Sequence, residues 1–198
     1  RWLLKKEFQL KKIKVGHAGT LDPLATGLLI LCTGKFTKKI ETFQAQVKEY
    51  TGAFTLGATT PSYDLETEID QTFDISSLTE DQIKQATQNF IGDIQQQPPV
   101  FSALKKDGKR LYEFARSGQE VEIPTRTIHI SVFEITQIKL PNVHFRVVCS
   151  KGTYIRSLAH DFGKALNNGA HLSALRRTKI GDFSVADAQS IEAFQENL

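Results

Sequence analysis

The feature that most constrains the fold is a stretch of alternating apolar residues from Val143 to Cys149. Apolar side chains occupy positions 143, 145, 147 and 149. Because successive side chains of a β-strand point to opposite faces of a sheet, this pattern predicts a strand that buries one face. Residues 47–57 and 128–140 are also predicted to be strands. The fold must therefore contain a sheet with an apolar face to cover.

Two other segments carry the signals of helices. Thr79 and Gln82 form the pattern of a capping box, and apolar residues follow at helical spacing until Gly92. Residues 153–169 place an apolar stripe on one side and end at a glycine. Strands and helices follow one another without the regular alternation of βαβ units. The sequence therefore predicts an α+β domain with a mixed, largely antiparallel central sheet flanked by helices and loops.

The N-terminal part is less regular. Residues 3–12 have apolar and basic side chains at helical spacing and are predicted to be a helix, whereas the glycine-rich residues 16–27 are predicted to be a loop. The apolar run Leu28–Cys32 is predicted to be a short buried strand. The sequence contains no methionine, so we expect a chain that has been trimmed at its N-terminus.

Composition excludes several classes of protein. Apolar residues make up 40% of the 198 residues and charged residues 24%, which is typical of a globular domain. No apolar stretch is long enough to cross a bilayer, so no membrane partner is expected. Cys32 and Cys149 both lie in apolar runs, which favours reduced core residues in a cytoplasmic protein over a disulfide.

Charge is distributed unevenly along the chain. No basic residue lies between Lys48 and Lys84, whereas eight acidic residues do, many of them in a predicted loop at 59–71. The rest of the chain then has 14 acidic and 25 basic residues, a balance of +11. Such an excess favours a polyanionic partner on one face, but an unevenly charged, solvated surface explains it equally well.

The sequence lacks the common cofactor-binding motifs. The segment "TGKFT" at 33–37 is similar to part of a phosphate-binding loop, but Leu29 and Phe36 stand where that loop needs a glycine and a hydroxyl residue. No histidine and cysteine spacing fits a zinc site, and no dinucleotide-binding fingerprint or G-x-S-x-G elbow is present. We therefore expect chemistry that uses side chains alone, with no metal and no cofactor.

One carboxylate stands out by its position. Asp22 lies between Leu21 and Pro23 in the glycine-rich stretch "GHAGTLDPLATG", directly before an apolar run. An aspartate before proline is biased towards extended backbone, so it seldom begins a helix. It can form an Asx turn with nearby amides or serve as a catalytic group, and spacing alone leaves both readings open.

Two other stretches are suited to binding a phosphate or a base. "CSKGTYIR" at 149–156 runs from a strand into a helix, where backbone amides and Lys151 can bind an anion. Arg156 lies in the first turn of that helix, which is unfavourable for a cation unless an anion faces it. Lys48 and Tyr50 share one side of a predicted strand.

These stretches and others resemble the TruB family of tRNA pseudouridine synthases. The matching motifs are "GHAGTLDPLATGLL", "KEYTGAFTLGATT", "QQPPVFSALKKDGKRLYEFARSG", "CSKGTYIRSLAHDFG" and "GAHLSALRRTKIGDF", and they follow the family's order over residues 13–183. The resemblance implies a pseudouridine synthase fold with an inserted RNA-gripping thumb at about residues 95–120. It also implies isomerisation of the T-loop uridine of tRNA, uridine-55, to pseudouridine after base flipping.

The resemblance implies catalytic or RNA-binding roles for three residues. Asp22 aligns with the catalytic aspartate, and Arg156 is expected to pair with it. His17 aligns with the histidine that takes the place vacated by the flipped uridine. Without the resemblance, a hydrogen bond between His17 and the loop backbone would be the simpler expectation.

Three more residues are implied to form the base pocket. Tyr50 would stack on the flipped base with Tyr154 beside it, and Leu175 would form the apolar side. Taken alone, Tyr50 is typical of half-buried strand packing and Leu175 of a core residue. Basic residues on or beside the family's RNA-contact motifs are expected to meet phosphates, although each could be plain solvated surface: Lys105, Lys106, Lys109, Arg110, Arg116, Arg176, Arg177 and Lys179.

The implied reaction suits a single carboxylate. The C1′–N1 bond of uridine breaks, the base turns, and C1′ joins C5, so no water enters. A glycoside hydrolase would need a second carboxyl group about 5 to 9.5 Å from the first, and none belongs to these motifs. An ionised Asp22 can attack the sugar or stabilise an oxocarbenium-like centre, and an arginine partner favours its charged form.

The expected partner is the T-arm stem-loop of tRNA, bound by a monomer without a guide RNA. We expect one catalytic domain over residues 1–198 that lacks the family's opening strand and its C-terminal PUA-type domain. Two alternatives are an RNA-binding module without activity and a nucleoside hydrolase. The presence of both Asp22 and Arg156 disfavours the first, and the missing second carboxylate disfavours the second.

Overall fold

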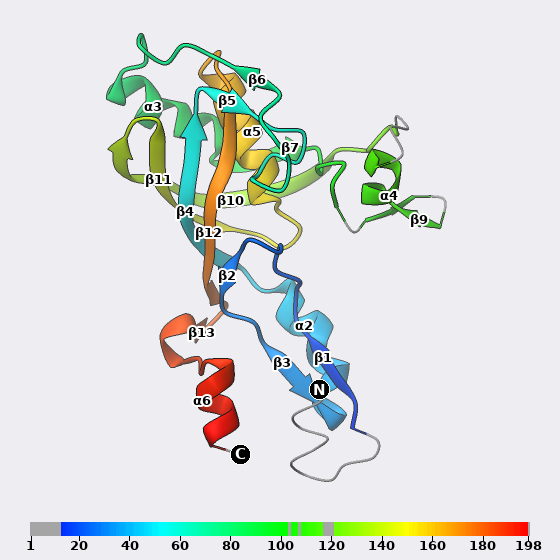
Figure 1. Cartoon of the computed structure of the whole chain (residues 1–198). Coiled ribbons are helices and arrows are strands. Elements are labelled where there is room, and N and C mark those ends of the chain that lie inside the picture. The colour runs from blue at the N-terminus through cyan, green and yellow to red at the C-terminus, as the bar shows by residue number, and fades with distance from the viewer. Residues whose placement is uncertain (1–12, 103, 107, 117–120, 198) are drawn as a thin grey trace.

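A central antiparallel sheet organises the part of the chain that the computed structural model describes, residues 13–102, 104–106, 108–116 and 121–197 (Figure 1). Across the sheet, the strands are β13 (Phe183–Ser184), β12 (Ala170–Ile180), β4 (Lys48–Leu56), β11 (Asn142–Cys149), β10 (Arg126–Lys139) and β7 (Gly92–Gln96). Each neighbouring pair in this order is antiparallel, and the short β2 (Thr26–Gly27) pairs with β12 in parallel. The prediction of a mixed, largely antiparallel sheet is confirmed.

The middle of the sheet is set by β4, which pairs along its length with β11 on one side and with β12 on the other. In the β4–β12 pair, Leu175 lies opposite Gly52. A Cβ atom added at Gly52 would lie 2.1 Å from the backbone oxygen of Ala174. Because glycine has no Cβ atom, the two strands can approach closely at this point. The close approach brings Leu175 next to the residues of β4.

The core lies on one face of the sheet and is rich in aromatic rings. The ring of Phe54 on β4 is fully buried and stacks on Phe145 of β11, with ring centroids 4.2 Å apart. It also contacts Phe162 of α5 (Ile155–Ala165), and Ile83 of α3 (Glu80–Ala86) belongs to the same buried cluster. Both helices therefore cover the apolar face that the alternating strands provide.

Both predicted helices are present. In α3, the Thr79 side chain accepts from the amide of Gln82, whose own side chain accepts from the Thr79 amide, so the capping box is confirmed. The last turn continues as the 3₁₀ helix η2 (Thr87–Phe90). The second helix, α5, ends earlier than predicted, because Asn167 rather than a glycine adopts the left-handed conformation, with φ 51°.

The prediction of a buried strand at Leu28–Cys32 is wrong. The strand is β3 (Leu31–Thr33), which pairs with β1 (Val15–His17) in a separate two-stranded ribbon away from the central sheet (Figure 1). Such a ribbon has too little surface to cover both faces of a strand, so Leu31 is 58% exposed whereas Cys32 is buried. The helix predicted at 3–12 lies outside the described residues.

The remaining elements lie around the sheet. They are η1 (Gly34–Lys39), α2 (Ile40–Ala45), β5 (Ala58–Thr59), β6 (Gln71–Thr72), β8 (Lys105–Lys106), β9 (Lys109–Arg110), α4 (Leu111–Arg116), η3 (Val185–Asp187) and α6 (Ile191–Glu196). The segment with β8, β9 and α4 stands away from the sheet (Figure 1). Among the helices of the described ranges, none is long and apolar enough to cross a bilayer.

The aromatic core predicts a large cost for Phe54→Ala. Removing a fully buried ring that packs against three other rings leaves a cavity, so the free energy of unfolding should fall by about 3–5 kcal/mol. Ile191→Ala is the matched control, because its side chain is 72% exposed, and its cost should stay below about 0.5 kcal/mol. Urea unfolding followed by circular dichroism measures both, and comparable losses would contradict this description of the core.

Candidate active site

The loop at 18–25, within the glycine-rich stretch 16–27, is held against the sheet by the buried side chain of Arg177. The Nε atom of Arg177 donates to the carbonyl of Leu28 (2.8 Å), and Nη2 donates to the carbonyl of Gly19 (3.1 Å). At Gly27, which pairs with β12, a Cβ atom would lie only 2.2 Å from the Arg177 carbonyl oxygen. The loop therefore follows one path across the edge of β12, and this path fixes the backbone on which Asp22 stands.

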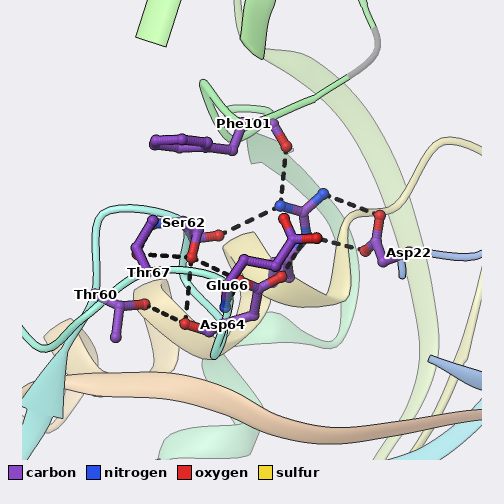
Figure 2. A network of polar contacts seen from close by, with 8 residues as sticks. Asp22, Thr60, Ser62, Asp64, Glu66, Thr67 and Phe101 are labelled. Atoms are coloured by element: carbon purple, nitrogen blue, oxygen red, sulfur yellow. Dashed lines mark hydrogen bonds and ion pairs between the residues drawn. The ribbon is translucent and has the colours of Figure 1, made fainter. Parts of the chain in front are cut away.

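Asp22 and Arg156, which lie 134 residues apart in the sequence, form a two-pronged ion pair (Figure 2). Nε of Arg156 is 2.9 Å from Oδ2 of Asp22, and Nη2 is 3.0 Å from Oδ1. Such bidentate pairs fix the orientation of the carboxylate as well as its charge. The Arg156 side chain is 5% exposed and that of Asp22 is 36% exposed, so only the carboxylate faces outwards.

The other side of the Arg156 guanidinium meets three more acceptors. Its Nη1 donates to the carbonyls of Phe101 (2.9 Å) and Ser62 (3.4 Å), and Nε lies 3.5 Å from Oδ2 of Asp64. Asp64 is itself held, because Oδ1 accepts from the Ser62 hydroxyl (2.6 Å) and from the Glu66 amide (3.0 Å). A buried charge is tolerated only when it is paired and hydrogen-bonded, and this network meets that condition.

Sequence reasoning missed the part that Asp64 plays. The sequence places it in an acidic loop, which predicts a solvated carboxylate, but its side chain is 5% exposed. The local signal was the neighbouring hydroxyl residues: Thr60 donates to the Asp64 carbonyl, and the hydroxyl of Thr67 lies 2.8 Å from that of Ser62. The hydroxyl groups provide hydrogen-bond partners inside the loop. They hold Asp64 where its carboxylate can pair with Arg156.

A cavity of about 570 Å³ opens beside Asp22. The structure brings four of the predicted site residues to its wall: Asp22, Tyr50, Tyr154 and Leu175. Arg156 lies behind this wall and holds Asp22 in place. His17, on β1, is exposed and does not line the cavity. Polar, aromatic and apolar walls together suit a planar, polar ligand such as a nucleobase.

Tyr154 is fixed by its backbone and by an arginine that sequence reasoning missed. The buried Gln96 side chain accepts from the Tyr154 amide (2.8 Å) and donates to its carbonyl (3.1 Å). The Arg126 guanidinium lies 5.3 Å from the centre of the Tyr154 ring, within cation–π range. Arg126 also lines the cavity, so it adds a positive charge to the wall.

The remaining cationic groups at the cavity differ in burial. Lys48 is buried and donates to the carbonyls of Gln44 and Gln46, and burial lowers its pKa from the usual range. Lys151 is exposed in the turn before Tyr154, where an anion can reach it. Arg177 is 2% exposed and bonds the loop, so the alternative of plain solvated surface is wrong for this residue, while its contact with phosphate stays a prediction.

The neutral groups near the cavity are held in their uncharged forms. Burial raises the pKa of Tyr50, and Arg177 only partly opposes this shift, so the phenol keeps its proton near neutral pH. Burial also raises the pKa of the Cys149 thiol to about 11. A thiol with this pKa is a poor nucleophile at pH 7. Asp22 therefore remains the exposed anionic group of this wall.

The unequal burial of the ion pair predicts unequal costs of mutation. Arg156→Met leaves Asp64 buried without its cation, so the free energy of unfolding should fall by about 3–5 kcal/mol. Asp22→Asn removes a partly exposed partner and leaves Arg156 with Asp64 and two carbonyls, so it should cost less than about 1 kcal/mol. Urea unfolding of both variants measures the difference. Equal costs would mean that Arg156 is not a buried anchor.

The sequence matches two protein-family models over almost its whole length. Residues 5–155 match "TruB family pseudouridylate synthase (N terminal domain)", and residues 156–198 match "tRNA pseudouridylate synthase B C-terminal domain". The chain is 65% identical over 188 residues to the tRNA pseudouridine synthase B of Flavobacterium johnsoniae, which covers 95% of this chain and 82% of that protein. It is 55% identical over 198 residues to the protein of the same name from Phocaeicola vulgatus. That match covers 100% of this chain and 84% of the Phocaeicola protein.

Solved structures agree with the sequence comparison. A chain of the "Crystal Structure of a Cbf5-Nop10-Gar1 Complex" is similar with a TM-score of 0.67 and 34% identity, covering 91% of this chain and 44% of that one. A chain of an H/ACA RNP bound to a substrate RNA containing 2′-deoxyuridine has a TM-score of 0.63 and 31% identity, covering 91% and 42%. The fold, the sequence and the family models agree, and the chain belongs to the TruB family of pseudouridine synthases, which are isomerases.

Proposed function

We propose that this chain converts the T-loop uridine of tRNA, uridine-55, to pseudouridine, with Asp22 as the catalytic group. The supporting observation is the asymmetry of the ion pair: Arg156 is buried, while the carboxylate that it orients faces a cavity large enough for a nucleoside. The two relatives named tRNA pseudouridine synthase B, at 65% and 55% identity, support tRNA as the substrate.

The reaction needs a carboxylate that stays charged next to the ribose. Asp22 keeps two hydrogen bonds to a guanidinium while one side of it faces the cavity. In that place it can bond to C1′ or stabilise an oxocarbenium-like centre while the C1′–N1 bond breaks. The uracil then turns and C1′ joins C5, and any bond between Asp22 and C1′ breaks as this bond forms. C5 releases its proton and N1 takes one up, so the product has the same formula as uridine. Both routes need an ionised aspartate, and Arg156 is the cation that pairs with it.

The uridine must leave the RNA stack to reach Asp22. Flipping costs a few kcal/mol, and stacking on an aromatic ring offsets this cost by about 1–3 kcal/mol per base. We assign the stacking face to Tyr50, with Tyr154 beside it, and the apolar side of the pocket to Leu175. We propose that His17 occupies the position in the RNA that the flipped uridine vacates. Its exposed position outside the cavity is in keeping with this role.

A nucleoside hydrolase is the less favoured alternative. Asp64 is a second carboxylate near Asp22, but it is buried, and its oxygens already accept from Ser62 and Glu66 and pair with Arg156. A hydrolytic base must reach a water molecule on the open side of the sugar. Asp64 does not line the cavity of about 570 Å³ beside Asp22, and the cavity that the two acids share is only about 20 Å³. An enzyme with one open carboxylate suits bond exchange without water.

We further propose that the enzyme acts as a cytoplasmic monomer on tRNA, without a guide RNA. The segment at about 95–120, which carries β8, β9 and α4, is assigned as the thumb that grips the T arm. The part of this segment that carries β8, β9 and α4 stands away from the sheet, so it can contact RNA that enters the cavity (Figure 1). Cys32 and Cys149 are free and buried, in keeping with a reducing compartment.

Asp22→Asn tests the catalytic assignment. The amide keeps the size of the side chain but loses the charge, so the rate of pseudouridine formation in a T-arm stem-loop should fall by at least about 100-fold. Affinity for the stem-loop should change little, because the other contacts remain. Release of tritium from 5-tritiated uridine measures isomerisation, and free uracil measures hydrolysis. Wild-type turnover by the variant would refute the role of Asp22, and uracil release would favour a hydrolase.

The proposed RNA contacts predict a steep dependence of tRNA affinity on salt. Between about 50 and 200 mM salt, the logarithm of the association constant should fall linearly with the logarithm of the salt concentration. Each phosphate contact that is removed should reduce the steepness of this slope by about 0.7–0.9. The triple variant Lys105→Ala, Lys106→Ala, Lys109→Ala tests the thumb. Lys84→Ala on α3 is the control, because Lys84 pairs with Glu80. A flat salt dependence would contradict an RNA-binding basic face.

A further inference from the structure

A stacked pair of rings, Tyr63 and His160, adjoins the residues that hold Arg156. Their ring centroids are 4.0 Å apart and their planes differ by 13°. Tyr63 stands between Ser62 and Asp64, both of which contact the Arg156 guanidinium. His160 follows Arg156 by four residues in α5, so both side chains leave the helix on the same side. The ring pair therefore joins the same two segments that the Arg156 contacts join.

The backbone at Tyr63 is strained. Its φ angle is +64°, in the left-handed region that residues with a Cβ atom seldom adopt. This turn sends the Ser62 carbonyl and the Asp64 carboxylate towards Arg156, at 3.4 Å from Nη1 and 3.5 Å from Nε. A change of conformation at residue 63 would redirect both acceptors. The Tyr63 amide donates to the Thr60 carbonyl (3.1 Å), and the Tyr63 carbonyl accepts from the Leu172 amide (2.9 Å), so the backbone supports part of this turn. The stack on His160 is a contact that holds the side chain.

His160 is suited to hold Tyr63 through its ring face rather than through a hydrogen bond. Its Nδ1 atom is buried and has no hydrogen-bond partner among the described residues. Burial lowers the pKa of His160 to about 4, so the ring is neutral near pH 7. A cavity of about 560 Å³ adjoins both rings. Without the stacking partner, the Tyr63 side chain would have open space to move into.

We propose that Tyr63 and His160 are positioning residues for the reaction. Their stack holds the left-handed turn at residue 63, which aims Ser62 and Asp64 at Arg156 and so fixes the orientation of Asp22. Neither ring lines the cavity beside Asp22, so the pair acts through Arg156 and not on the RNA. The inference rests on the proposed function, because its effect is measured as pseudouridine formation.

The test compares His160→Ala with His160→Phe in single-turnover reactions on a T-arm stem-loop. Alanine removes the ring and should lower the rate roughly 10- to 100-fold, because a small displacement of the reacting groups is costly. Stem-loop affinity should change less than about threefold, because the lost interaction orients the catalytic group and does not bind RNA. Phenylalanine keeps the stack and should restore the rate to within about threefold of wild type. Lys164→Ala, one turn further along α5, lines the same cavity and should react at the wild-type rate.

A second variant separates the stack from general destabilisation. Tyr63→Ala removes the ring but keeps the Cβ atom that makes a φ of +64° unfavourable, so the turn loses the support of the stack. It should fold, and it should react more slowly than wild type with unchanged affinity. Adding His160→Ala to Tyr63→Ala should slow the reaction by less than about twofold more, because the stack is already absent. Circular dichroism checks that each variant is folded at the assay temperature.

Each outcome decides the proposal. A folded His160→Ala enzyme with the wild-type rate overturns it, as does a loss confined to stem-loop affinity or one that phenylalanine does not restore. If His160→Ala does not fold, Tyr63→Ala decides: a wild-type rate overturns the inference, and a slower rate with unchanged affinity supports it. If the wild-type and Lys164→Ala enzymes both form no pseudouridine, the proposed function fails, and the inference fails with it.

Discussion

The site depends on the burial of one guanidinium. A charge that is removed from water must be paired and hydrogen-bonded, or the fold loses several kcal/mol. Arg156 meets this condition with two carboxylates and two backbone carbonyls. Among these acceptors, the Asp22 carboxylate is the one that also lines the cavity. The same interaction that the fold needs for stability therefore sets the direction of the proposed catalytic group.

This requirement ties the site to distant parts of the chain. The acceptors of Arg156 come from the glycine-rich loop, from the turn around Asp64, and from Phe101, which precedes β8. The helix that carries Arg156 packs against the core through Phe162. The guanidinium has all of its hydrogen-bond partners only when each of these segments is in its folded position. The geometry of the site therefore depends on the whole fold. The Phe101 carbonyl also links the proposed thumb directly to Arg156.

Sequence patterns predicted what depends on local chemistry and on alternation. The alternating strands, the capping box at Thr79 and the antiparallel sheet follow from side-chain period and hydrogen-bonding groups. The family resemblance led to Asp22 and Arg156, which spacing alone leaves open. What could not be predicted depends on tertiary context: Leu31 is exposed because no layer of the described residues covers its ribbon, and Arg177 is buried where it bonds the Leu28 and Gly19 carbonyls.

Asp64 shows why the rest of the site could not be predicted. The hydroxyl residues of "TTPSYDLE" are a local signal of internal hydrogen bonds, but they do not reveal that Asp64 is 5% exposed and paired with an arginine 92 positions later. The left-handed turn at Tyr63 is equally hidden, because tyrosine does not signal a positive φ angle as glycine does. Both features involve contacts with distant parts of the chain: Asp64 pairs with Arg156, and the Tyr63 carbonyl accepts from the Leu172 amide.

The different burial of the two carboxylates also bears on the class of reaction. Two open acids on either side of a sugar would allow water to be activated and the glycosidic bond to be hydrolysed. Here one acid is open and the other is closed over by hydroxyl groups, an amide and the guanidinium. The closed acid supplies charge to Arg156 and does not line the cavity of about 570 Å³ beside Asp22. A site of this kind suits an isomerase. It can hold the ribose C1′ after its bond to N1 breaks, until the same base rejoins C1′ through C5.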